Sequence, residues 1–193
     1  MAIRDPAATR RRVVDAARVV FAESGPAGAR VDAIAAAAQT SKERLYANFR
    51  TKDELFELVL GESVDEWLSA VPFTVDDLPG YAGALFDHLC THDVDARLIL
   101  WGQLSSRSTS ALMQTGEELL ERRGVEVADA QARGAINPDW DPADLFVMIY
   151  GIVMSWIINP GTPTMPHVAD VEQQRRRSIV ASTVSLLVQP RGR

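Results

Sequence analysis

Apolar residues recur at three- and four-residue spacings along most of the chain, and this pattern restricts the possible folds more than any other feature. One example is the stripe of Val13, Val14, Ala17, Val20 and Phe21, which matches one face of a helix with 3.6 residues per turn. No segment shows the alternation that is typical of a half-buried strand. The sequence therefore predicts an all-α fold of about nine helices.

Start and stop signals divide this pattern into short and long helices. Gly25 and Pro26 are expected to end the first helix, and Ser41 to cap a short helix over residues 42–48. Thr51 and Glu54 form a capping box for a further helix that ends before Pro72. The other predicted helices cover approximately residues 31–38, 79–91, 94–106, 111–133, 142–158 and 168–188.

The composition is that of an ordinary globular protein, with 47% hydrophobic and 24% charged residues in a chain of 193. Cys90 is the single cysteine, which excludes an internal disulfide and is typical of a reducing compartment. The first residues lack the apolar stretch of a signal peptide. The longest apolar run, over residues 145–158, is shorter than the roughly 20 residues of a membrane-spanning helix. We therefore expect a cytoplasmic protein that does not enter the membrane.

Charge is distributed unevenly along the chain. Residues 1–52 carry ten Lys or Arg against five acids, whereas residues 53–193 carry ten against 21, although the whole chain has a formal charge of −6. A basic segment beside an acidic remainder indicates a small module that faces a polyanion such as DNA. An arginine-rich helical surface exposed to solvent would give the same count, so charge alone leaves both interpretations open.

Two of the predicted helices, over residues 31–38 and 42–48, are short, lie within the basic segment and are separated by three residues. Such a pair is typical of a helix-turn-helix, whose second helix enters the major groove of DNA. Lys42 and Arg44 stand near the start of that helix and can donate to O6 and N7 of guanine. The alternative is a three-helix packing unit with a solvated face. Side chains suited to phosphate oxygens are those of Ser41, Tyr46, Asn48 and Lys52.

Four segments carry a likeness to a known family: RVVDAARVVFAESG (12–25), VDAIAAAA (31–38), SKERLYANF (41–49) and KDELF (52–56). In order and spacing they resemble the N-terminal domain of TetR-family transcriptional regulators. The resemblance implies a helix-turn-helix DNA-binding domain over residues 1–52, followed by a larger helical domain over residues 53–193 for ligand binding and dimerisation.

The resemblance also implies a mechanism and a set of contacts. A homodimer would place its two reading heads on successive major grooves of a palindromic double-stranded DNA operator, and a small-molecule effector would release it, so that repression is relieved. By position in the family motif, base reading falls to Lys42 and Arg44, and phosphate binding to Tyr46, Asn48 and Lys52.

Two positions depart from the family pattern. Gln39 stands where the tight turn often carries glycine, so this residue needs a left-handed or relaxed backbone. Val31 stands where the second helix often begins with a hydroxyl residue that binds phosphate. Arg30 is the candidate that could replace this contact.

The apolar segment over residues 145–158 must be covered on every side. The last predicted helix is its obvious companion, and two such helices from each chain would form the dimer interface that the resemblance implies. The alternative is that both helices belong to the core of one chain. The candidates for the dimer interface are Ile152, Trp156, Ile179, Val180, Val184 and Leu187.

A ligand pocket would be mostly apolar with a few placed polar groups. The sequence does not identify the ligand, and each candidate residue could also belong to an ordinary core. The alternative function is therefore a dimeric DNA-binding protein whose C-terminal domain is an interaction module without a small-molecule site. The pocket candidates are Trp67, Phe86, Trp101, Gln103, Met113, Tyr150 and Met154.

Other motifs predict neither a metal, a cofactor nor catalysis. His88 and His92 are spaced as two ligands on one helix face, but Cys90 lies on the opposite face, so we expect solvated histidines. The arginines at 175–177 spread around a helix turn and are expected to face solvent. No glycine-rich phosphate loop or nucleophile elbow is present, and the sequence therefore predicts a protein that is not an enzyme.

Overall fold

The structure is a computed structural model that describes residues 6–105, 109–159 and 169–190. Within these ranges the chain is helical and contains no strand, so the predicted all-α class is confirmed. None of the helices in these ranges is long and apolar enough to cross a membrane. A short 3-10 helix over Val75–Asp77 was not predicted.

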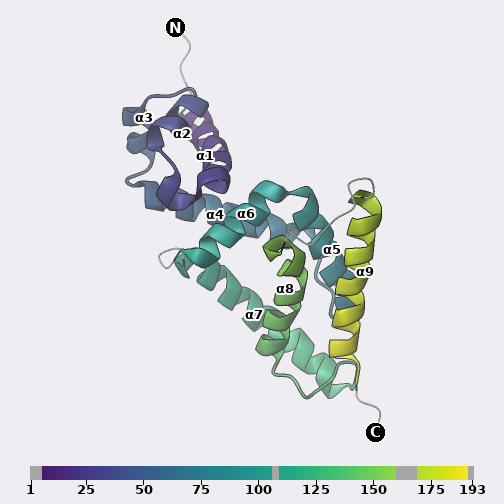
Figure 1. Ribbon diagram of the computed structural model, residues 1–193. Helices are drawn as coiled ribbons and strands as arrows, with labels where there is room; N and C mark the ends of the chain where they lie inside the picture. Colours follow the sequence, from purple (N-terminus) through teal and green to yellow (C-terminus); the bar gives the residue numbers. More distant parts are fainter. Residues whose placement is uncertain (1–5, 106–108, 160–168, 191–193) are drawn as a thin grey trace. The chain divides into compact units, whose positions relative to one another are not determined.

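Nine α-helices follow one another along the described chain (Figure 1). Their positions agree with the predicted segments to within a few residues, because the caps and prolines that mark the ends are local signals. The helices are α1 (Pro6–Gly28), α2 (Val31–Ala37), α3 (Lys42–Asn48), α4 (Lys52–Ala70), α5 (Leu78–Thr91), α6 (Asp93–Leu104), α7 (Thr109–Ala132), α8 (Pro142–Ile158) and α9 (Ala169–Val188).

The chain forms two compact units, and α4 and α7 each contribute to both. The first unit consists of Met1–Glu66 and Asp93–Thr115, and the second of Trp67–His92 and Gly116–Arg193. The first unit thus contains α6 as well as the predicted helix-turn-helix. The domain boundary predicted after residue 52 stays a prediction.

The core of the first unit is built from the apolar stripe of α1. Phe21 is fully buried and meets Phe56 of α4 edge to face, with ring centroids 5.1 Å apart. Ile34 of α2 and Leu45 of α3 are also fully buried. Each short helix is therefore attached to α1 by large apolar side chains, and its polar face remains exposed.

Helix α6 lies along α1, and the two are joined at a break in α1 (Figure 1). The indole N–H of Trp101 donates to the carbonyl of Ala22 at 3.3 Å. At Gly25 the backbone is non-helical, with φ 67° and ψ 170°, and helix resumes at Pro26. The predicted end of α1 is therefore a kink, because proline suits the first turn of a new helical segment.

In the second unit α5, α8 and α9 lie side by side (Figure 1). Asp141 caps α8 by accepting from the backbone N–H of Ala143 at 2.8 Å, as its position before Pro142 predicts. Helix α8 contributes Leu145 and Val153 to the core. Helix α9 packs against both α5 and α8, so it covers more than the apolar segment for which it was proposed as companion.

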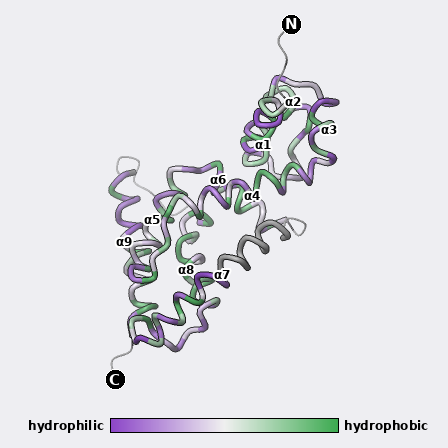
Figure 2. Tube along the Cα trace, turned by 180° about the vertical axis from the view of Figure 1, so that it is seen from behind, coloured by the Kyte–Doolittle hydropathy of each residue, from purple (hydrophilic) through white to green (hydrophobic). Residues whose placement is uncertain are grey.

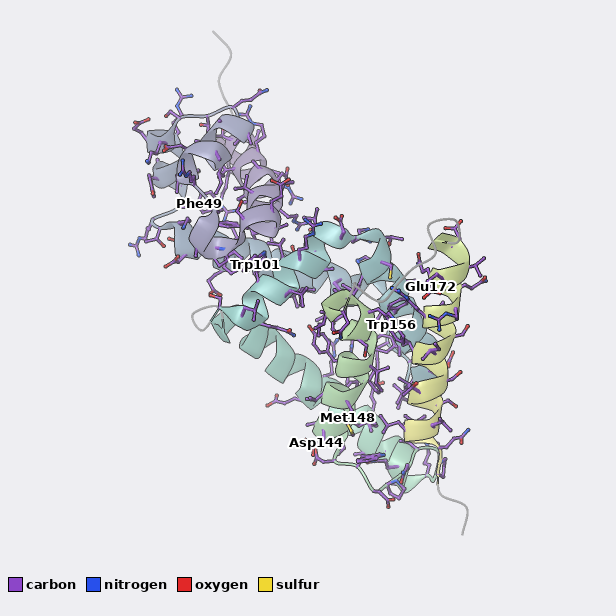
Figure 3. The ribbon with its side chains drawn as sticks, viewed as in Figure 1. Phe49, Trp101, Asp144, Met148, Trp156 and Glu172 are labelled. Atoms are coloured by element: carbon purple, nitrogen blue, oxygen red, sulfur yellow. The ribbon has the colours of Figure 1, made fainter. Side chains whose placement is uncertain are left out.

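The prediction that the arginines at 175–177 face solvent is wrong for Arg176, whose side chain is 12% exposed, whereas Arg177 is 41% exposed and also contacts Asp87. Arg177 Nε donates to Asp87 Oδ2 of α5 at 2.6 Å. Arg176 Nε donates to Glu172 at 2.9 Å, and its guanidinium lies 5.9 Å from the ring centroid of Trp156 on α8 (Figure 3). Because α9 sits against both α5 and α8, this side of the helix meets protein rather than water.

Candidate nucleic-acid interface

The turn between α2 and α3 is a left-handed turn with two closing hydrogen bonds. Gln39 has φ 52° and is the one non-glycine residue of the described chain with a positive φ. Its N–H donates to Ala36 O at 3.0 Å, and Thr40 N–H donates to Ala35 O at 2.9 Å. This pair of bonds defines a Schellman motif. Of the two backbone conformations expected at Gln39, left-handed or relaxed, the structure shows the left-handed one.

Replacing Gln39 with glycine should stabilise the protein by about 0.5–1 kcal/mol, because a left-handed backbone costs an L-residue about 1–2 kcal/mol and glycine adds an entropic cost of about half that. Replacing Gln39 with alanine removes the side chain but keeps this backbone cost, so it is the matched control. We expect urea unfolding to show a higher midpoint for Gln39→Gly alone. Equal midpoints for the two variants would contradict the strain assigned to this turn.

Helix α3 is fixed at its start and along its inner face. Ser41 caps it, since its Oγ accepts from Arg44 N at 3.3 Å. The pKa of Glu43 in the first turn is lowered by its own backbone N–H and then by the Ser41 hydroxyl. Leu45 is fully buried, and Phe49 is nearly so, with the Arg10 guanidinium 5.3 Å from its ring centroid (Figure 3).

The remaining side of α3 is hydrophilic and exposed (Figure 2). Lys42 and Arg44, the predicted base-reading residues, both lie on it. Lys42 Nζ is 3.1 Å from Asp32 Oδ1 of α2, and the hydrogen bond and charge of this carboxylate raise the pKa of Lys42. The Arg44 guanidinium pairs with no acid among the residues that the structure describes. Arg44 is therefore the more available donor to a base edge, whereas the ammonium group of Lys42 is already paired with Asp32.

The predicted phosphate-binding residues differ in how they are held. Tyr46 is 41% exposed. Asn48 is half-buried, and its Nδ2 donates to Arg44 O at 2.7 Å. Arg30 is exposed and precedes α2 without capping it.

Lys52 is tied to the loop between α1 and α2. Its Nζ donates to Ala29 O at 3.1 Å and to Ala27 O at 3.4 Å. An ammonium group has three N–H donors, so one remains for a phosphate oxygen. Half of the predicted capping box is confirmed, because Thr51 Oγ1 accepts from Glu54 N at 3.0 Å, whereas the Glu54 carboxylate accepts from the N–H of Arg50 at 2.9 Å, one residue before the cap.

The predicted pocket residues fall in both units. Trp101 and Gln103 belong to the first unit, where Trp101 packs on α1. Trp67 and Tyr150 belong to the second and meet edge to face with ring centroids 5.7 Å apart; burial raises the pKa of Tyr150. Also in the second unit, Phe86 and Met154 are buried. The side chain of Met113 lies outside the described residues.

The residues of α8 and α9 that were predicted to form the dimer interface differ from one another in how deeply they are buried. Val180 and Val184 are fully buried within the chain. Ile152, Trp156 and Leu187 are half-buried, and Ile179 is 37% exposed. The most exposed apolar residues of these helices, which the sequence interpretation missed, are Val147, Ile158, Val171 and Leu186.

His88 of α5 and His92, the residue that follows this helix, form a stacked pair rather than a ligand set. Their rings lie parallel, with centroids 3.9 Å apart, and His92 is exposed. No group of three or more metal-binding side chains occurs in the described parts of the chain. This end of α5 therefore offers no second candidate site.

Comparison with known proteins places this arrangement in a family. Residues 13–59 match the bacterial regulatory proteins of the tetR family, and residues 77–185 match the tetracyclin repressor-like C-terminal domain. The HTH-type transcriptional repressor SCO4008 of Streptomyces coelicolor is 35% identical over 160 residues, which are 82% of each protein.

Solved structures show the same fold. The SCO4942 protein of Streptomyces coelicolor is 37% identical, with a TM-score of 0.77 over 93% of this chain and 98% of that one. GusR of Salmonella enterica shares the fold at 20% identity, with a TM-score of 0.71 over 96% of this chain and 98% of that one. With its capped helix-turn-helix and matches to both family domains, the chain belongs to the TetR family and is a DNA-binding transcriptional regulator.

Proposed function

We propose that this regulator is a cytoplasmic repressor that binds a palindromic operator as a homodimer and is released by a small-molecule effector, without an enzymatic step. The main support for this proposal is the geometry of α3. This short helix is capped by Ser41 and anchored by Leu45, and it has Lys42 and Arg44 on its exposed side. The relative SCO4008 is named a transcriptional repressor, which supports repression rather than activation. DNA binding is assigned to residues 1–52, and effector binding and dimerisation to residues 53–193.

Each DNA contact follows from the position of its side chain. Arg44 and Lys42 would read base edges, because they are exposed near the start of α3. The phosphate contacts would fix the register of the head on the duplex without reading sequence. These contacts are assigned to Arg30, Ser41, Tyr46, Asn48 and Lys52.

Dimerisation is supported by apolar surface on α8 and α9. Val147 of α8 is 62% exposed and Leu186 of α9 is 75% exposed. Large apolar side chains left exposed on two helices that pack together are candidates for a surface that another subunit covers. The partly exposed Ile152, Trp156, Ile179 and Leu187 would extend this interface, while Val180 and Val184 support it from within the chain.

Selection of binding sites from a random pool of duplex DNA tests the proposal. A dimer should enrich a palindrome whose half-site centres are about 10 base pairs apart. Arg30 and Lys52 give each subunit two cationic phosphate contacts, so the dimer has about four, and affinity should fall roughly a hundredfold between about 50 and 200 mM salt because each contact releases counterions. Enrichment of a single, non-palindromic site would contradict the dimer, and the absence of enrichment would contradict sequence-specific binding by this head.

Replacing Asp32 with asparagine should tighten binding to unrelated DNA by about threefold at low salt, because a negative charge is lost, and should tighten binding to the operator by more, because Lys42 is freed to read a base edge. The change frees Lys42 from the ion pair of 3.1 Å and removes a negative charge near the phosphates. Fluorescence anisotropy with both DNAs measures the effect. Asp65→Asn, at an exposed carboxylate of α4, removes the same charge and serves as the matched control. Unchanged or weaker binding by Asp32→Asn would contradict the position assigned to Lys42 on DNA.

A further inference from the structure

Arg123 of α7 is a buried cation without a carboxylate partner. It is 5% exposed, and none of the described carboxylates lies within ion-pair distance of it. Its Nη1 donates to the hydroxyl of Tyr81, and its Nε has no acceptor among the described residues. The guanidinium also lies 4.7 Å from the ring centroid of Phe73 and 5.2 Å from that of Tyr81.

Burying a charge in this way is unfavourable for the free energy of folding. The charge loses its hydration, which only a counter-ion or several hydrogen bonds can replace. Arg18 in the other unit shows the usual solution, since it reaches Glu66 at 2.6 Å and Asp95 at 3.7 Å. Two aromatic faces and one hydroxyl compensate Arg123 only in part. The described chain therefore leaves a buried positive charge whose counter-ion must come from elsewhere.

A pocket of about 350 Å³ opens beside Arg123, between the end of α4 and the middle of α7. Its volume is within the range of about 300–1,000 Å³ that small-molecule sites occupy. The lining includes the apolar residues Leu68, Val71, Pro72 and Phe73, but polar atoms make up the larger part of its exposed surface, and the pocket is partly open to solvent. The charged groups of the lining are Arg122, Arg123 and Glu126, which leave a net charge of one positive unit.

We infer that this pocket binds a small apolar monocarboxylate whose carboxylate pairs with Arg123. A single negative charge balances the lining, and its apolar residues can contact a short hydrocarbon body. The planar guanidinium fork matches the geometry of a carboxylate. Glu126 disfavours a second negative charge, which separates this class from phosphates and dicarboxylates. The inference rests on the proposed function, because it names the chemical class of the effector.

Calorimetric titration of the full-length protein with 3-phenylpropionate and octanoate, each against its uncharged amide, tests the inference. We expect at least one acid to bind about tenfold or more tightly than its amide, since only the acid supplies the missing counter-ion. Glu126→Gln should tighten binding of that acid severalfold. If neither acid binds better than its amide, the inference is wrong.

Arg123→Met distinguishes a ligand-binding arginine from a structural one. A buried ion without a partner can be replaced by an apolar residue of similar length without loss of stability. We therefore expect the ligand-free variant to melt at or above the parent temperature and to lose the preference for acid over amide. A lower melting temperature together with an unchanged preference would overturn the assignment. Ser69→Phe, at the pocket lining on α4, should block binding while Arg123 stays in place.

Operator binding measured on the same samples distinguishes a failure of the carboxylate inference from a failure of the proposed DNA-binding function. Intact DNA binding without carboxylate binding rejects the inference and leaves the proposed DNA-binding function standing. Carboxylate binding without release of the operator confirms the pocket chemistry and rejects its role as effector site.

Discussion

Arg44→Ala should weaken binding to the selected operator by about 30-fold or more, because the dimer loses one arginine–guanine contact in each half-site, and should leave binding to unrelated DNA within about twofold. A bidentate arginine–guanine contact contributes about 1–3 kcal/mol of discrimination, whereas binding to unrelated DNA depends on phosphates. Arg44 is the exposed donor of α3 that no described acid neutralises. Lys42→Ala should cost less, because Lys42 already pairs with Asp32 at 3.1 Å.

Fluorescence anisotropy with operator and scrambled duplexes at one salt concentration measures this difference. Arg133→Ala is the matched control, since it removes the same exposed charge from the end of α7. We expect Arg133→Ala to bind both duplexes as the parent does. Equal losses of Arg44→Ala on operator and scrambled DNA would show that Arg44 contacts phosphate rather than a base edge.

Gly25→Ala should destabilise the protein by about 3 kcal/mol, which corresponds to a fall of roughly 10 °C in melting temperature. Two costs add at this position. The backbone, with φ 67° and ψ 170°, lies in a region that is open almost exclusively to glycine. A Cβ atom would also lie 2.9 Å from Cδ2 and Cε3 of Trp101, whose ring cannot move without losing its hydrogen bond to Ala22.

Gly134→Ala separates these two costs. Gly134 also has a positive φ, 74°, but no atom lies within 4 Å of the position that its Cβ would take. We expect Gly134→Ala to cost only the backbone strain, about 1 kcal/mol. A second check combines Gly25→Ala with Trp101→Ala, which should cost less than the sum of the single changes because the clash disappears. Equal melting temperatures for the two glycine variants would contradict the close contact between α1 and α6.

The features that sequence predicted well are local ones. Ser41, Thr51 and Asp141 cap the helices that follow them, and each accepts a backbone hydrogen bond within the next three residues. The left-handed backbone at Gln39 was also predictable, because the turn that joins two helices this closely requires it. Such signals depend on neighbouring residues and need no knowledge of the tertiary fold.

Contacts between distant residues were not predictable in the same way. Lys42 and Asp32 were both visible as charged residues, but their pairing depends on the packing of α3 against α2. Lys52 was expected to face DNA, and its hydrogen bonds to Ala29 and Ala27 depend on where the preceding loop passes. Its role is therefore structural as well as, by our proposal, DNA-binding.

The sequence contained a signal for the pocket, at Arg123, that was not recognised. Arg123 lies four and seven residues before Val127 and Ala130, and all three are buried. The helical period therefore places a charged residue on an apolar face, which is a recognisable sign of a functional cation. Of the aromatic residues proposed for the pocket, Trp67 lies in the core of the second unit, and Trp101 is half-buried against α1 in the first.

Methylation protection of the selected operator by dimethyl sulfate tests the central claim most directly, because this reagent reports on guanine N7 in the major groove. We expect the parent to protect guanine in both half-sites and Arg44→Ala to lose one protected guanine from each. Protection that is identical for the two proteins, or confined to one half-site, would contradict the assignment of α3 as the reading helix of a dimer.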